Sequence, residues 1–96
     1  MAHTYILECS DGTLYLGSTI DLQRRLLQHS DGAGARYTAE RLPVRLLWSA
    51  ESASIRDAFF SEKMLQGWSQ PKKRALIEGR FGDLPGLSRS RREAPE

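Results

Sequence analysis

The N-terminal part of the chain contains two short apolar runs separated by turn-forming residues. The first run covers residues 4–7 and the second residues 14–16, with Asp11-Gly12 between them. Two such runs around an Asp-Gly pair predict a β-hairpin. The length of its loop matters, because a one-residue change of register moves every side chain of a strand to the other face of the sheet.

Two tyrosines depend on this register. If the loop has three residues, 10–12, with Gly12 in the left-handed conformation of a bulged turn, Tyr5 lies opposite Gly17 and shares a face with Tyr15. A two-residue loop would place the tyrosines on opposite faces. A site that uses both tyrosines therefore requires the three-residue loop.

The pattern changes to a helical period after the hairpin. Leu22 and Leu26, four residues apart, predict the buried stripe of a short helix that ends near His29. Arg25 and His29 are also four apart and lie on a neighbouring face. The preceding polar residues, Thr19 or Asp21, can cap the first turn.

The remaining segments predict one strand and two helices. A polar, glycine-containing stretch at 30–42 indicates a functional or mobile loop, and the run 44–48 predicts a third strand. A helix is expected over 55–66, followed by a shorter one that Ser69 caps and that ends near Gly79. The expected fold class is α+β: a small three-stranded antiparallel sheet, the hairpin plus one strand, packed with about three helices.

The composition fits an ordinary globular protein of one domain. The chain has 96 residues, of which 40% are apolar and 27% charged. We expect the domain to cover residues 1–87 and residues 88–96 to form a disordered basic tail. The single cysteine, Cys9, excludes an internal disulfide and fits a reducing compartment. With neither a secretion signal nor an apolar run long enough to span a membrane, the expected location is the cytoplasm.

The charge pattern leans toward anionic partners. The net charge is only +2, but basic residues recur in separate segments: Arg24 and Arg25, Arg36, Arg41 and Arg45, and Lys72-Lys73-Arg74. A fold that gathers them would have a basic face suited to nucleic acid. A scatter of solvated surface charges is an equally weighted alternative.

One acidic residue lies in an apolar stripe. Ile55, Ala58, Phe59 and Leu65 predict the buried face of the 55–66 helix, and Glu62 occupies a position within it. A buried carboxylate needs a partner. The partner is either an arginine in a salt bridge or a hard divalent cation that also binds a phosphate oxygen.

Several short motifs, in this order and spacing, resemble those of the GIY-YIG nuclease family, and more narrowly its small single-domain bacterial members. The first signature keeps its tyrosine in His3-Thr4-Tyr5, and the second keeps both outer residues in Tyr15-Leu16-Gly17. The family's arginine, the helix position four residues later and the metal-binding glutamate match Arg25, His29 and Glu62. The stretches 34–38 and 67–77 also resemble this branch, so the resemblance covers about residues 3–79.

The resemblance implies a metal-dependent endonuclease that hydrolyses phosphodiester bonds in DNA, acting in repair or recombination. With no appended recognition domain, structure-directed or weakly specific cleavage is expected rather than recognition of a long sequence. The implied catalytic residues are Tyr5, Tyr15, Arg25, His29 and Glu62. Glu62 would hold one Mg²⁺ or Mn²⁺ on the phosphate, and Arg25 would neutralise the equatorial oxygens. We expect Tyr15 to take the proton from water, Tyr5 to orient water or metal, and His29 to assist proton transfer or contact phosphate.

Substrate contacts are expected at residues around this centre: Gly17, Arg24, Arg36, Tyr37, Lys72 and Lys73. Gly17 lacks a side chain and would let the substrate or the Arg25 helix approach the strand. The expected partner is nucleic acid, most simply DNA, and a protein partner could supply targeting.

Two departures from the family pattern favour an alternative. The DNA-repair members carry a lysine directly after the second signature, where this chain has Ser18, and the family's late asparagine has no counterpart near Lys72. The alternative is a nucleic-acid-binding module of the same fold that is catalytically weak or inactive. A protein-interaction module that uses Tyr37 and Trp68 is a third possibility, although it has no need for Arg25 and Glu62.

Overall fold

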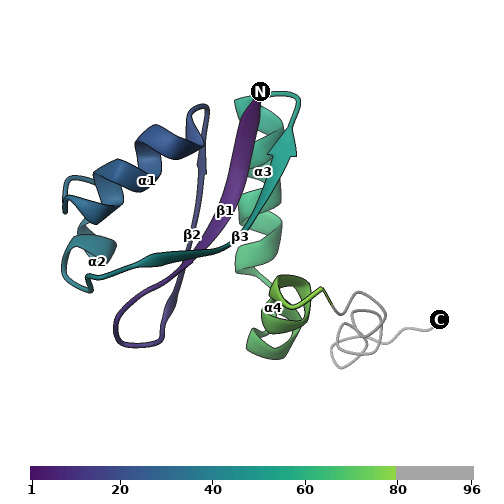
Figure 1. Cartoon of the computed structure of the whole chain (residues 1–96). Coiled ribbons are helices and arrows are strands. Elements are labelled where there is room, and N and C mark those ends of the chain that lie inside the picture. The colour runs from purple at the N-terminus through teal and green to yellow at the C-terminus, as the bar shows by residue number, and fades with distance from the viewer. Residues whose placement is uncertain (80–96) are drawn as a thin grey trace. The chain divides into compact units, whose positions relative to one another are not determined.

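The computed structural model describes residues 1–79, which form three strands and four helices (Figure 1). The strands are β1 (Ala2–Glu8), β2 (Leu14–Thr19) and β3 (Arg45–Ser52); the helices are α1 (Leu22–Ser30), α2 (Arg36–Ala39), α3 (Ile55–Gln66) and α4 (Gln70–Ile77). The predicted α+β class is confirmed. The predicted tail and the end of the predicted domain at residue 87 lie outside the described residues. The chain divides into two compact units, one of residues 1–63 and one that starts at Met64.

The first unit is built on an antiparallel sheet with the strand order β2-β1-β3. Tyr5 pairs with Gly17. Gly12 has a φ of +84°, and Cys9 N donates to Thr13 O at 2.9 Å across the turn. The loop therefore has three residues, and the register that places both tyrosines on one face is confirmed. Between β1 and β3 the register shifts once, between Ile6 and Leu7.

The central strand β1 is buried on both faces. Tyr5, Ile6 and Leu7 are at most 1% exposed, which explains why this run is continuously apolar rather than alternating. Thr4 is on the face toward α3, since its Oγ1 donates to Ala58 O at 2.8 Å. Tyr5 is on the opposite face, toward α1. The core of the first unit thus has one helix against each face of β1.

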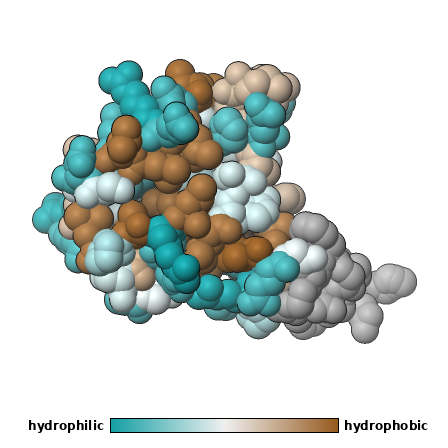
Figure 2. All heavy atoms as spheres, viewed as in Figure 1, coloured by the Kyte–Doolittle hydropathy of each residue, from teal (hydrophilic) through white to brown (hydrophobic). Residues whose placement is uncertain are grey.

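The predicted helical stripes are only partly correct. In α1 the leucines at 22 and 26 are half-buried, and the fully buried residue is His29. In α3 the small residue Ala58 is buried, whereas Ile55 and Phe59 are 45% and 48% exposed. The prediction that these two residues face the core was wrong, because a close approach of α3 to β1 at Ala58 turns them outward. Apolar surface is visible over the described part of the chain in Figure 2.

The stretch 30–42, predicted as a loop, contains the one-turn helix α2. This helix makes the count of helices four rather than about three. Ala35 N-caps it without a side-chain hydrogen bond, and Thr38 Oγ1 instead donates back to Ala35 O at 2.9 Å. That bond stabilises a turn too short to be stable by itself.

The second unit contains α4, which begins and ends as the sequence predicts. Ser69 Oγ accepts from Lys72 N at 3.3 Å, Pro71 lies in the first turn, and Gly79 has a φ of +76°. Lys72 is 8% exposed, and its ammonium lies 4.0 Å from the centroid of the Trp68 ring. Within residues 1–79, no helix has the length and apolar character needed to cross a membrane.

Candidate active site

The two signature tyrosines and one histidine form a cluster on the α1 side of the sheet. The ring centroids of Tyr5 and Tyr15 are 6.5 Å apart, and those of Tyr5 and His29 are 5.7 Å apart. Tyr15 and His29 are closer still, at 5.4 Å. The three-residue turn and the period of α1 bring these rings together, as the register argument predicted.

Tyr5 forms the buried centre of the cluster. Its hydroxyl lies 2.9 Å from His29 Nε2, and the two residues are 1% and 0% exposed. A Cβ on Gly17 would lie 2.6 Å from Tyr5 Cζ and closer still to the hydroxyl. The space beside Gly17 is therefore taken by Tyr5. The absence of a side chain at Gly17 thus makes room for Tyr5, and the expected contact of Gly17 with substrate stays a prediction.

Two residues that support His29 were not identified from the sequence. Thr38 Oγ1 lies 2.8 Å from His29 Nδ1, and Thr38 is fully buried. A Cβ on Gly34 would lie 2.6 Å from the same nitrogen. Both residues belong to the stretch 34–38 that resembled the small-protein branch. That resemblance was the available signal, but the spacing alone does not show that α2 folds back onto α1.

Burial sets the protonation of this cluster. Burial raises the pKa of Tyr5; a hydrogen bond from Arg25 acts in the opposite direction, and the nearby Tyr15 and Glu62 add to the rise. Burial lowers the pKa of His29, and the charge of Arg25 lowers it further. At neutral pH Tyr5 is thus a phenol and His29 a neutral imidazole. Arg25 is half-buried and also donates from Nη1 to Gln28 Oε1 at 3.0 Å.

Glu62 approaches the cluster from the other face of the sheet. It is half-buried on α3, and Ser18 Oγ donates to its Oε1 at 2.8 Å. Ser18 follows Gly17 on the edge strand β2 and pairs with Thr4, whose side chain faces α3. The charge of Glu62 contributes to the raised pKa of Tyr5, so the carboxylate lies within electrostatic range of the cluster.

The donor set fits a metal that takes most of its ligands from water and phosphate. The described residues hold no group of three His, Cys, Asp or Glu side chains that could enclose an ion. Mg²⁺ typically binds through one or two carboxylates and keeps several waters. Glu62, half-buried and oriented by Ser18, is suited to such a site.

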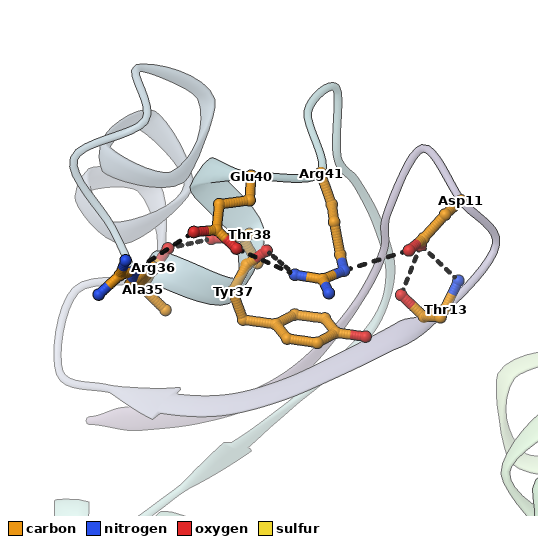
Figure 3. A network of polar contacts seen from close by, with 8 residues as sticks. All are labelled: Asp11, Thr13, Ala35, Arg36, Tyr37, Thr38, Glu40 and Arg41. Carbon is orange, nitrogen blue, oxygen red and sulfur yellow. Dashed lines mark hydrogen bonds and ion pairs between the residues drawn. The ribbon is translucent and has the colours of Figure 1, made fainter.

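Tyr37, a predicted substrate contact, packs on the cluster. Its ring stacks on that of Tyr15, with centroids 6.1 Å apart and planes 23° apart. Arg41 holds it there: its guanidinium carbon lies 3.8 Å from the Tyr37 ring centroid, and its Nε donates to Asp11 Oδ2 at 3.1 Å. Figure 3 shows this network, which joins the hairpin turn to α2. Hydrogen bonds from Thr13 are the main reason that the pKa of Asp11 is lowered.

Within the first unit, the other predicted basic residues are exposed, and some of them pair with acids. Arg24 is exposed on α1, and Arg36, with a 91% exposed side chain, pairs with Glu40 at 3.2 Å. Arg45 pairs with Glu8 at 2.9 Å. Lys72 and Lys73 belong to the second unit. Several of the candidate cations are therefore balanced by neighbouring acids, as the alternative of scattered surface charges requires.

Comparison with known proteins identifies the family. The model of the GIY-YIG catalytic domain matches residues 1–75. The chain belongs to the GIY-YIG family. A UPF0213 protein of Streptococcus pneumoniae serotype 4 is 42% identical over 76 residues, 79% of this chain and 77% of that protein. One of Halobacterium salinarum is 43% identical over 77 residues, 80% of this chain and 100% of that protein.

A solved structure agrees with the fold of this GIY-YIG chain. The solution NMR structure of a UPF0213 protein from Bacillus halodurans has a TM-score of 0.54 and 34% sequence identity, and the match covers 97% of this chain and 100% of that one. GIY-YIG domains form a nuclease family, whereas the name UPF0213 specifies no activity. The family supports nucleic acid as the partner. In this GIY-YIG chain, Ser18 orients the glutamate from the position where the repair members carry lysine.

Proposed function

We propose that this protein is a divalent-metal-dependent endonuclease that hydrolyses phosphodiester bonds in DNA. The observation that carries the proposal is that Arg25 and Glu62, from two different helices, both act on Tyr5, with the ring of Tyr15 beside it. Hydrolysis of a phosphodiester requires a base for water, positive charge on the transition state and help for the leaving oxygen. Simple packing of a strand and two helices does not require these groups to converge.

Each side chain has a role that follows from its environment. Arg25 is half-buried and permanently charged, and it offers a planar set of donors to the equatorial phosphate oxygens. Tyr15 is half-buried and lies nearer to solvent than Tyr5, so it is the tyrosine that takes the proton from water. Tyr5, with its raised pKa, stays protonated and orients the groups around it. His29 is neutral and holds Tyr5 through Nε2.

Glu62 would hold Mg²⁺ or Mn²⁺, which when bound supplies positive charge to the phosphate and favours ionisation of the attacking water. Ser18 donates to one oxygen of Glu62 and so helps to orient the carboxylate. In this chain Ser18 therefore acts on the carboxylate rather than on the phosphate. The loss of the family lysine removes one cation, and Arg25 is the cation that remains beside Tyr5.

The substrate class follows from the size of the domain and its modest charge. With a net charge of +2, long-range attraction to the backbone is weak, so recognition of DNA shape at a branch or a lesion is more suitable than binding along a duplex. Arg24 is exposed next to Arg25 and is placed to contact an adjacent phosphate. Work on such structures in the cytoplasm would place the protein in DNA repair or recombination.

The alternative function is binding without turnover. The pairing of Arg36 and Arg45 with Glu40 and Glu8, together with Ser18 in place of lysine, supports it. A binding module would hold nucleic acid with an affinity that falls steeply as salt rises, and it would cleave nothing with either metal.

The decisive experiment incubates a panel of duplex, single-stranded, branched and nicked DNA, and matched RNA, with Mg²⁺ or Mn²⁺. We expect cleavage of at least one DNA that chelation abolishes. Glu62→Gln keeps the shape of the side chain and should lower the rate at least a hundredfold, the usual effect of losing a metal ligand, as should Arg25→Ala. Glu51→Gln, at an exposed strand glutamate, is the matched control.

Cleavage by Glu62→Gln at the wild-type rate would refute the metal site. An absence of cleavage across the panel, combined with salt-sensitive binding, would instead establish the binding module.

A further inference from the structure

A line of buried polar groups runs from the active site into α2. The Tyr5 hydroxyl lies 2.9 Å from His29 Nε2, and His29 Nδ1 lies 2.8 Å from Thr38 Oγ1. Thr38 Oγ1 lies 2.9 Å from Ala35 O. The three side chains are at most 1% exposed, so their hydrogen bonds must be satisfied within the protein.

The inner end of the line determines the direction of its hydrogen bonds. Ala35 O is a carbonyl oxygen and can only accept. If Thr38 donates its single hydroxyl hydrogen to Ala35 O, the Thr38 oxygen must accept from His29 Nδ1. The neutral imidazole then carries its proton on Nδ1, and Nε2 accepts from the Tyr5 hydroxyl.

The opposite tautomer satisfies fewer groups. With the proton on Nε2, Thr38 must donate to Nδ1, which leaves the oxygens of Thr38 and Ala35 2.9 Å apart with no hydrogen between them. The Tyr5 proton then loses His29 as its acceptor. Arg25, which forms a hydrogen bond with Tyr5, cannot accept this proton because a guanidinium only donates. Buried groups without partners disfavour this arrangement.

We propose that Thr38 is a positioning residue that fixes His29 as the Nδ1–H tautomer, so that the Tyr5 oxygen is presented as an acceptor to the Arg25 guanidinium. All the hydrogen bonds then run in one direction, from Arg25 to the Ala35 carbonyl. In such a chain each bond polarises the next. Through Thr38, His29 and Tyr5, the Ala35 carbonyl thus helps to fix the position of the Arg25 guanidinium.

Two further observations support the proposal. Burial and the charge of Arg25 lower the pKa of His29, which keeps the ring neutral and its Nε2 able to accept. A Cβ on Gly34 would lie 2.6 Å from His29 Nδ1, so the ring packs directly against the backbone of Gly34, next to Thr38. The role assigned to Arg25 rests on the proposed nuclease function, whereas the tautomer does not.

The test reads the tautomer directly by NMR of the full-length protein labelled with ¹⁵N. In the wild type at neutral pH, we expect the His29 Nδ1 resonance to be that of a protonated nitrogen and the Nε2 resonance that of an unprotonated one. Thr38→Val removes the hydroxyl at nearly constant volume and should abolish this preference. It should also lower kcat/KM for the cleaved DNA about tenfold, mainly through kcat, the scale of one lost hydrogen bond.

Two further variants separate positioning from simple packing. Thr38→Ser keeps the hydroxyl and should restore both the tautomer and the rate. Thr4→Val is the matched control, because Thr4 is also fully buried and donates to a backbone carbonyl, Ala58 O, but does not contact His29. It should lower stability and leave the His29 resonances unchanged.

A wild-type spectrum with the proton on Nε2 would overturn the proposal, and so would a folded Thr38→Val protein that keeps the Nδ1–H tautomer. If Thr38→Val does not fold, the wild-type and Thr38→Ser spectra decide, since both must show the Nδ1–H form. The tautomer is measured without substrate. A protein that cleaves nothing would therefore refute the nuclease function while the tautomer still decides the role of Thr38.

Discussion

Replacing Gly17 by alanine should destabilise this protein, although the same change in an ordinary strand would stabilise it. The added Cβ would lie 2.6 Å from Tyr5 Cζ, whereas ordinary contact begins at 3.4 Å, so the ring must retreat by about 0.8 Å. Tyr5 is 1% exposed and its hydroxyl is bound to His29, so the ring has little freedom to move away from the added Cβ. Overpacking of this kind costs about 1–3 kcal/mol.

The net effect is the difference of two terms. An alanine in a strand gains about 0.5–1 kcal/mol over glycine through lower backbone entropy. The midpoints of the two ranges, about 2 and about 0.75 kcal/mol, leave a net loss of about 1.25 kcal/mol, which in a domain of this size lowers the Tm by about 5–10 °C. Thermal unfolding followed by circular dichroism, together with urea titration, measures both quantities.

A matched glycine provides the control. A Cβ on Gly67 would have its nearest neighbour, Met64 O, at 3.5 Å, an ordinary contact. Gly67→Ala should therefore stay within about 0.5 kcal/mol of the wild type. If Gly17→Ala is as stable as the wild type or more so, the close packing of Tyr5 on the edge strand is refuted, and with it the register argument for the site.

Two other predictions concern α1. The free energy of unfolding should fall as the pH drops below about 6.5, by at most about 1.4 kcal/mol per pH unit, because the pKa of His29 is lower in the folded protein and only the unfolded chain takes up the proton there. Urea titrations across this range should give a shallower dependence for His29→Gln, and an unchanged slope would contradict the neutral ring. Asp21→Ala removes the acceptor of Arg24 N at 3.1 Å and should cost about 1 kcal/mol by the same assay. The Asp21→Ala protein should be clearly less stable than the Asp31→Ala protein, which is changed at the other end of α1. Equal stabilities of the two variants would count against the role of Asp21 as the N-cap.

The hairpin and its register could be predicted because local chemistry determines them. Asp11-Gly12 supplies the turn, and a loop with an odd number of residues lets Tyr5 and Tyr15 share a face. The structure has this loop, with Gly12 at a φ of +84°. The cap of α4 at Ser69 was predictable for the same reason. These features depend on residues that are neighbours in the chain.

The features that were missed depend on residues distant in sequence. The expected core face of α3 included Ile55 and Phe59, but the residue that packs against β1 is Ala58. The spacing of apolar residues does not show that the helix face with the small residue, rather than the face with the large ones, is buried. Thr38 could not be assigned to His29 because their contact requires the chain to fold back through α2. The signature residues were found because their types are unusual, whereas the residues that support them are common types.

The three-residue turn has a consequence for how this hairpin can change length. A residue deleted or inserted within 10–12 leaves Cys9 and Thr13 able to pair, so the register of the strands and the shared face of Tyr5 and Tyr15 can be kept with a different turn type. What a changed loop would disturb is the position of Asp11, whose carboxylate binds Arg41 and so connects the turn to the segment that carries Tyr37. Libraries of turn variants sorted by activity should therefore keep an acid that can reach Arg41, whatever the length of the loop.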